Sequence, residues 1–170
     1  LDPMQPDAPA PGQTEAEVQI QTASYGDPIP DALGSPKISG NIFWYDNNRS
    51  VEEKQEAEGG KGGGGSQEQV TGYKWYLSWA QGVCLGPVDK LLAVYANDDC
   101  VWSGELDYNA NGEEIELYDD MGTMRFYFGS STQPQDSLLS SYLDDLTPAY
   151  RGLCYAVFDD CYIGDYNRCP

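Results

Sequence analysis

The sequence predicts a mainly β fold: a barrel-like antiparallel domain with one short α-helix and long loops. Composition is the first reason, because thirteen Tyr and four Trp, together with nineteen Gly and eleven Pro in 170 residues, favour strands and turns over helices. The second is that several segments alternate apolar and polar residues, as a strand with two different faces does. The third is that only one segment has the helical period.

Residues 70–102 are expected to form the central unit of the fold. The pattern predicts a long strand, a tight turn at Gly86-Pro87, and a second apolar strand that contains Leu91 and Val94. Together they would make a hairpin. The large residues that share one face of the first strand are Tyr73, Trp75, Leu77 and Trp79. We expect Trp75 and Trp79 to pack in the core and not to bind a ligand.

Shorter strands are predicted on both sides of this unit. They cover residues 18–24, 37–45, 105–108, 114–118, 123–129 and 151–158. Gly40 interrupts the second of these and predicts a bulge or a sharp bend. Asn111-Gly112 predicts a hairpin turn between the third and the fourth. After Phe158 the sequence is expected to continue in turns.

Residues 136–145 predict the one helix, with an apolar stripe on a single face. Pro134 suits the first turn, and Pro148 follows the end. The stripe consists of Leu138, Leu139, Tyr142, Leu143 and Leu146.

The length corresponds to one domain, flanked by an arm and interrupted by one loop. Residues 1–16 are rich in Pro and predict an extended arm, and residues 17–170 predict the β-rich domain, incomplete at its C-terminal end. Residues 47–69 predict a flexible Gly-rich loop. Its GGKGGGG run differs from a phosphate-binding loop, because Lys61 is followed by four Gly and then by polar residues, with no helix to follow.

Charge and the lack of histidine exclude several functions. Twenty-eight Asp and Glu against nine Lys and Arg give a net charge of −19, which repels nucleic-acid phosphates and anionic membranes. We therefore expect no specific nucleic-acid binding. The absence of His removes Ser-His and Cys-His catalysis and the commonest zinc ligand. No apolar run approaches the length of a transmembrane helix.

Acidic residues offer two weaker candidate sites. Asp107, Asn109 and Asn111 match positions one, three and five of a calcium loop, but position twelve is Tyr118 and not a bidentate carboxylate. Sequential acidic pairs, which include Asp119 and Asp159, could serve a cell-wall glycan hydrolase that uses carboxylates alone. Neighbouring strand residues point to opposite faces, however, so a sequential pair does not make a two-carboxylate site. We expect no catalytic residue and no cofactor.

The five cysteines are expected to be thiols. Their number is odd and no CxxC pair occurs, which fits a reducing cytoplasm. The spacing of Cys154, Cys161 and Cys169 matches none of the usual metal or iron–sulfur ligand runs.

The order of these segments resembles the hub, or tail-tip, proteins of long-tailed bacteriophages, and is similar to the hub proteins of gene transfer agents. The likeness covers about residues 18–170. Its most specific parts are SYGDPIP, GVCLGPV and PAYRGLCYAVFDD.

The resemblance implies a structural, non-enzymatic virion component. It implies a barrel-like hub domain that forms a homotrimeric ring at the distal end of the tail tube, assembled in the bacterial cytoplasm. The implied partners are the neighbouring tail-tip, tail-tube and tape-measure proteins. The alternative that the residues leave open is an extracellular β-domain that binds a receptor or a glycan through exposed Tyr and Trp.

Overall fold

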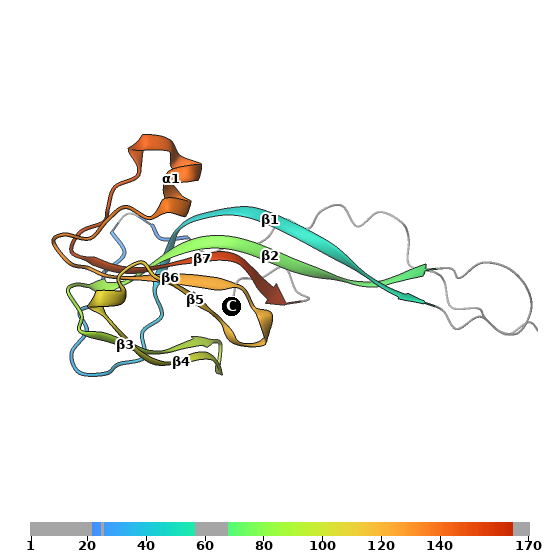
Figure 1. Cartoon of the computed structure of the whole chain (residues 1–170), viewed down its shortest axis with the longest axis horizontal. Helices are drawn as coiled ribbons and strands as arrows, with labels where there is room; N and C mark the ends of the chain where they lie inside the picture. Colours follow the sequence, from blue (N-terminus) through green and yellow to red (C-terminus); the bar gives the residue numbers. More distant parts are fainter. Residues whose placement is uncertain (1–21, 25, 57–67, 165–170) are drawn as a thin grey trace, which may run out of the picture.

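The computed structural model describes residues 22–24, 26–56 and 68–164, and these residues confirm the mainly β class. Five strands form one antiparallel sheet in the order β1-β2-β7-β6-β5, and two more form a second sheet, β3-β4 (Figure 1). No closed barrel is found among the described residues. The strands are β1 (Asn41–Glu56), β2 (Glu68–Leu85), β3 (Lys90–Ala96), β4 (Asp99–Asp107), β5 (Glu114–Glu116), β6 (Thr123–Phe128) and β7 (Leu153–Gly164).

The centre of the larger sheet is β7, which lies between β2 and β6. One face of this sheet packs toward β3 and β4, where Trp79 stacks on Phe158 with ring centroids 4.3 Å apart. The other face lies toward the helix, and there Tyr127 stacks on Tyr155 at 4.5 Å. Both faces of β7 are therefore buried, as its apolar run requires.

The packing role predicted for two tryptophans is confirmed. Trp79 is 5% exposed, and Trp75 is partly buried against the same core. Tyr73 belongs to the same alternation but is 44% exposed, because it lies beyond the end of β7, which reaches only the position opposite Trp75.

The predicted hairpin across residues 70–102 is wrong. β2 pairs with β1 and β7, whereas β3 pairs with β4 in the other sheet. The Gly86-Pro87 bond is cis, and this turn carries the chain from one sheet to the other. A local apolar pattern predicts two strands, but it does not say which strand each will pair with.

The predicted loop 47–69 is wrong over the residues that the structure describes. β1 continues to Glu56 and β2 starts at Glu68, and these two residues face each other in the ladder. Beyond Trp75 the two strands have no third neighbour among the described residues, and Figure 1 shows them extending away from the body. Both faces of such a pair meet solvent, so its strands carry polar residues without alternation. Residues 57–67 lie outside the described part.

A second predicted hairpin, at Asn111-Gly112, is also wrong. β4 pairs with β3 and β5 with β6, so the chain crosses between the sheets here. Asp107 caps a 3-10 turn, Tyr108–Ala110, and Asn111 Oδ1 accepts a hydrogen bond of 3.0 Å from Phe128 N. Gly112 has φ +80, a conformation that glycine adopts without strain.

The helix forms where predicted, but its stripe is mostly exposed. α1 spans Ser137–Leu143 and a 3-10 turn follows at Asp144–Leu146. The capping residue is Asp136, whose carboxylate accepts a bond from Leu139 N at 2.8 Å. Leu139 is buried, whereas Tyr142 is 42% and Leu146 89% exposed.

The two ends of the sequence differ from expectation. β7 runs on to Gly164, so the turns expected after Phe158 are wrong at the start of that segment, where Cys161 and Ile163 are buried. The strand expected at 37–45 begins only at Asn41. Of the strand expected at 18–24, Thr22 makes a parallel bridge to Ile42. The arm 1–16, residues 17–21 and residues 165–170 lie outside the described part.

The three most specific segments of the resemblance meet at one end of the larger sheet. Leu85 N, in GVCLGPV, donates to Pro30 O of SYGDPIP at 2.9 Å. Next to it, Gly86 N donates to Gly152 O at 2.8 Å, and Cys84 lies opposite Cys154, which places PAYRGLCYAVFDD against the same turn. Segments far apart in the sequence thus form one junction.

This junction depends on glycine. A Cβ on Gly86 would lie 2.6 Å from Gly129 Cα and 2.9 Å from Phe128 O, closer than real Cβ atoms approach. A Cβ on Gly129 would meet Gly86 Cα at 2.7 Å. The backbones therefore touch where a side chain has no space.

We expect Gly86→Ala to lower the free energy of unfolding by about 1–3 kcal/mol, because the added methyl forces the two backbones apart. Gly72→Ala is the matched control, since its Cβ would meet only Glu53 Oε2 at 3.5 Å, and we expect a change within about 0.5 kcal/mol. Urea denaturation measures both. Equal stability of the two variants would contradict this account of the junction.

Candidate interaction surfaces

The ribbon, formed by residues 51–56 of β1 and 68–74 of β2, is a two-stranded arm beyond the body. Its pairs run from Val51 opposite Lys74 to Glu56 opposite Glu68. Across it Lys74 Nζ lies 2.8 Å from Glu53 Oε1, and Thr71 Oγ1 donates to Glu53 O at 3.2 Å. Such a pair of strands is only marginally stable in water without further packing.

Three apolar side chains on the ribbon are exposed. Val51 is 42%, Val70 41% and Tyr73 44% exposed. Because an exposed two-stranded arm also leaves its outer edges without strand partners among the described residues, it offers both backbone groups and apolar side chains to a neighbour.

Arg49 fastens the base of the ribbon to β7. Its Nε and Nη2 donate to the two carboxylate oxygens of Asp160 at 2.8 and 2.6 Å, a bidentate geometry. The guanidinium also lies over the Tyr76 ring, with Cζ 4.1 Å from the centroid. The hydrogen bonds that Arg49 donates to Asp160 raise the pKa of Arg49 further, so this cation stays charged.

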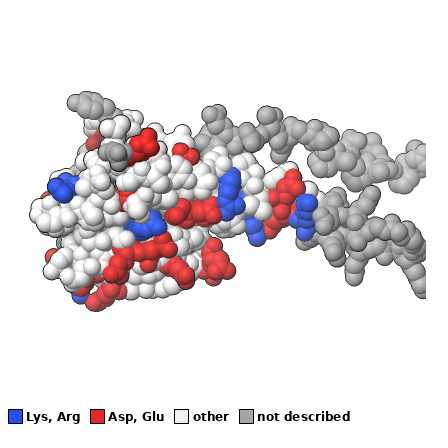
Figure 2. Space-filling view, turned by 45° about the horizontal axis from the view of Figure 1, so that its top comes forward, with Lys and Arg blue, Asp and Glu red and all other residues white. Residues whose placement is uncertain are grey.

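Residues 49–74, which include the ribbon, carry less net charge than the rest of the chain. Residues 49–74 hold four of the nine Lys and Arg and five of the 28 Asp and Glu, so they contribute only −1 to the net charge of −19. Figure 2 shows basic and acidic side chains mixed along the ribbon and acidic ones gathered over the body. Exposed acids of β4, β5 and the turns beside them are Asp98, Asp99, Glu105, Asp107, Glu113, Glu114, Glu116, Asp119 and Asp120.

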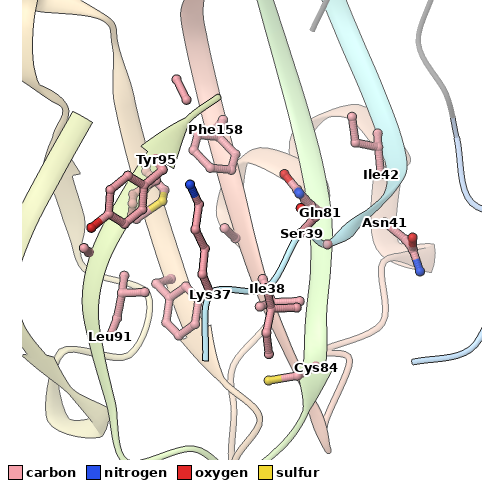
Figure 3. A pocket seen from close by; sticks show the side chains of 18 of the residues that line it. Lys37, Ile38, Ser39, Asn41, Ile42, Gln81, Cys84, Leu91, Tyr95 and Phe158 are labelled. Carbon is pink, nitrogen blue, oxygen red and sulfur yellow. The ribbon is translucent and has the colours of Figure 1, made fainter. Parts of the chain in front are cut away.

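A groove separates the two sheets, with a volume of about 1980 Å³. We call it the inter-sheet groove: residues 34–42 form one wall, β3 forms the other, and Trp79, Phe126 and Phe158 also belong to its lining. Figure 3 shows Phe158 together with Lys37 and Ile38 of one wall and Leu91 and Tyr95 of the other. Lys37 joins the walls, because its Nζ donates to Asn97 O at 3.1 Å and lies 4.4 Å from the Tyr95 ring centroid.

Two of the residues that match a calcium loop, Asp107 and Asn111, use their side-chain oxygens to accept hydrogen bonds from backbone amides. Asp107 Oδ1 accepts from Asn109 N at 2.9 Å, and Asn111 Oδ1 accepts from Phe128 N. In the described part of the chain no group of three or more Cys, Asp or Glu is placed to hold a metal ion. The Asp107 oxygen therefore caps the 3-10 turn, and the Asn111 oxygen accepts from the last residue of β6.

The two aspartates considered for glycan hydrolysis have separate surroundings. Asp159 Oδ1 accepts from Ser78 Oγ at 3.2 Å, and Ser78 Oγ accepts from Asp160 N at 2.9 Å. Asp119 is exposed on the 3-10 turn Tyr118–Asp120. No hydrogen bond joins Asp119 and Asp159 in the described part of the structure.

The cysteines that the structure describes are all thiols. Cys84, Cys154 and Cys161 are buried and Cys100 is exposed, whereas Cys169 lies outside the described residues. Burial raises the pKa of Cys154 and of Cys161 to about 12. Cys154 Sγ donates to Phe128 O at 3.1 Å, so this thiol is part of the junction.

Neither the ribbon nor the inter-sheet groove was anticipated from the sequence. One signal for the ribbon does exist, because Glu53 and Lys74 lie on opposite sides of the Gly-rich run and form an ion pair diagonally across the antiparallel ladder. The groove has no local signal, since its walls come from segments that the chain order keeps far apart.

No protein-family model matches the chain, and no curated protein matches it either. Within the described residues, no helix has the length and apolar character needed to span a lipid bilayer.

We expect only Cys100 to react rapidly with a maleimide in the folded Cys169→Ser variant, because the other three thiols are buried. Intact mass after a short exposure at pH 7 should show one adduct, and four after unfolding without a reductant. A shortfall after unfolding would reveal a disulfide and favour the extracellular alternative.

We expect the free energy of unfolding to fall as the pH rises above about 9. The thiols of the unfolded chain ionise near pH 8.5, whereas those of Cys154 and Cys161 keep their protons to about 12 in the folded protein. Their stabilising contribution is complete below the unfolded pKa and is lost between these two values. Burial raises the pKa of Tyr155 as well, which adds a loss of the same sign.

Urea denaturation from pH 7 to 11 measures this decline. Cys161→Ala should make the decline shallower, because it removes one of the buried thiols whose pKa is raised. A stability that stays constant to pH 11 would contradict the burial of ionisable groups in the core.

Proposed function

We propose that this chain is a non-enzymatic structural component of a phage-like virion, a tail hub module at the tail tip. In this proposal copies of the chain form a homotrimeric ring at the distal end of the tail tube, after assembly in the bacterial cytoplasm. Its neighbours are other tail-tip proteins, the tail tube and the tape-measure protein.

The observation that carries the proposal is the ribbon. It extends from the body as a pair of strands with exposed Val51, Val70 and Tyr73, a form that is marginally stable alone and that a neighbouring surface would stabilise. Arg49 and Asp160 fix its base, so the arm is presented in one direction and not as a loose loop.

The junction gives the resemblance a physical basis. The three segments on which the resemblance depends pack against one another around Leu85 and Gly86, so they form one structural unit and not three unrelated matches. The hub identity of this unit, the ring and its partners are all parts of the proposal.

The net negative charge is compatible with the proposed position at the tail tip, where DNA passes. A net charge of −19 gives the protein no attraction for the phosphates of DNA, so DNA could pass the protein without being bound. Residues 49–74, whose net charge is −1, can approach another acidic copy with less repulsion than the acidic surface of the body can.

We expect Val51→Asp combined with Tyr73→Asp to prevent assembly while leaving the fold intact, because both side chains are exposed in the isolated chain. Leu33→Asp combined with Leu146→Asp is the matched control, since these residues are 86% and 89% exposed outside the ribbon. Native mass should be three times 18.7 kDa for the unaltered chain and the control, and 18.7 kDa for the ribbon variant.

A shortened variant tests the ribbon as a whole. Ser50 and Trp75 are directly opposite, so a two-residue Asn-Gly turn can join them in place of residues 51–74. The melting temperature should stay close to that of the full chain, and incorporation into particles should be lost. Particle cryo-microscopy that placed the full chain away from the tail tip would end the proposal.

A further inference from the structure

Two buried cysteines face each other across the strand pair β2–β7. Cys84 of β2 is the register partner of Cys154 of β7, and the side chains of register partners lie on the same face of a sheet. Both belong to one apolar core, where Cys84 is 3% and Cys154 0% exposed. Opposed residues of an antiparallel pair have Cα atoms about 4.5–5.5 Å apart, which is within the range that a disulfide bond spans.

The other cysteines that the structure describes are not placed in this way. Cys161 of β7 lies opposite Leu77, and the exposed Cys100 of β4 lies opposite Tyr95. The described part of the chain therefore contains one pair of facing thiols, and the strand pairing alone brings them together.

We propose that Cys84 and Cys154 form a cross-strand disulfide bond when the folded protein meets a peroxide, so that the pair is a site of oxidative modification. In the first step the sulfur of Cys84 takes one oxygen of hydrogen peroxide, the O–O bond breaks, and one water leaves. In the second step the sulfur of Cys154 attacks the resulting sulfenic acid, the S–O bond breaks, and a second water leaves with the proton of Cys154. Two thiols lose two electrons in all, and one hydrogen peroxide is reduced to two waters.

The order of these steps follows from access and from acidity. Cys84 belongs to the lining of the inter-sheet groove, and Figure 3 shows its sulfur among the side chains there, whereas Cys154 is fully buried. Burial raises the pKa of both thiols, but the interaction between them lowers the pKa of Cys84 and raises that of Cys154. Since the thiolate is the reactive form, the thiol that the groove reaches is also the one that loses its proton more readily.

The bond would hold the centre of the larger sheet. It would join β7 to β2 beside the junction, and the loop that it closes runs from residue 84 to residue 154 and includes β3 to β6 and α1. Closing a long loop restricts the unfolded chain and so favours the folded state. In a reducing cytoplasm the pair stays as two thiols, and an oxidising medium supplies the condition for the bond. The inference does not depend on the virion role.

Peroxide treatment of the folded protein, followed by thiol counting, tests the proposal. Cys100→Ser combined with Cys169→Ser leaves three thiols, those of Cys84, Cys154 and Cys161. The sample is exposed to hydrogen peroxide at pH 8, quenched with catalase, unfolded and labelled with a maleimide. We expect the intact mass to show one adduct, and three adducts if the sample is reduced before labelling. Peptide mapping should find Cys84 bonded to Cys154.

Two further variants of this three-thiol protein are the matched controls. Cys161→Ala should lose both of its remaining thiols on oxidation, and Cys84→Ala should keep both. The urea midpoint of the three-thiol protein should rise on oxidation and return on reduction, whereas that of Cys84→Ala should not change.

Several results would overturn the proposal. Three adducts after oxidation of the folded protein would show that the facing thiols do not react. A bond that includes Cys161, or a bond between Cys84 and Cys154 that forms only in urea, would show that unfolding and not the strand pairing brings the sulfurs together. An oxidised protein that unfolds at a lower urea concentration would contradict the stabilising effect of the bond.

Discussion

Insertion of β7 between β2 and β6 is the interaction on which the rest of the structure depends. The strand that closes the described sequence is the centre of the sheet, so the larger sheet cannot form until the chain has returned past both of its neighbours. Its two faces bury Phe158 on one side and Tyr155 on the other, and each ring stacks on an aromatic residue of an adjacent strand. The two halves of the core therefore meet through one strand, and long-range contacts dominate the fold.

The close backbone contact at the junction, next to the first residue of β7, explains why the chain has glycine there. Gly86 and Gly129 let two backbones touch, and the thiol of Cys154 fills the remaining space. Because the hydrogen bonds of Gly86, Gly152 and Gly129 connect three segments in series, a change at any of them affects the positions of the other two. Packing at this point sets the angle at which the chain leaves the larger sheet for β3.

Local patterns in the sequence predicted elements well and partners poorly. The alternation of Met124, Phe126 and Phe128 identified β6 and one of its buried faces, and the helix expected from Asp136 begins at Ser137, directly after that residue. Pairing depends on contacts between distant residues, so the apolar runs on either side of Gly86-Pro87 gave no indication that they belong to different sheets. The ribbon was missed because alternation reports a buried face, and a strand exposed on both sides has none. The spacing of Asp107, Asn109 and Asn111 suggested a calcium loop, but the side-chain oxygens of Asp107 and Asn111 accept from backbone amides instead, which spacing alone does not reveal. The edge of β3 that has no strand partner among the described residues is visible only when both sheets are in place.

The continuity of β2 from the ribbon into the core has a mechanical consequence. Hydrogen bonds of an antiparallel ladder lie perpendicular to the strands, so a pull along the ribbon axis loads the bonds between β2 and β7 all together and in shear. Bonds loaded in this way resist more than bonds that open one after another from an end. Tension applied at the far end of the ribbon would therefore pass along β2 into its hydrogen bonds with the central strand, β7.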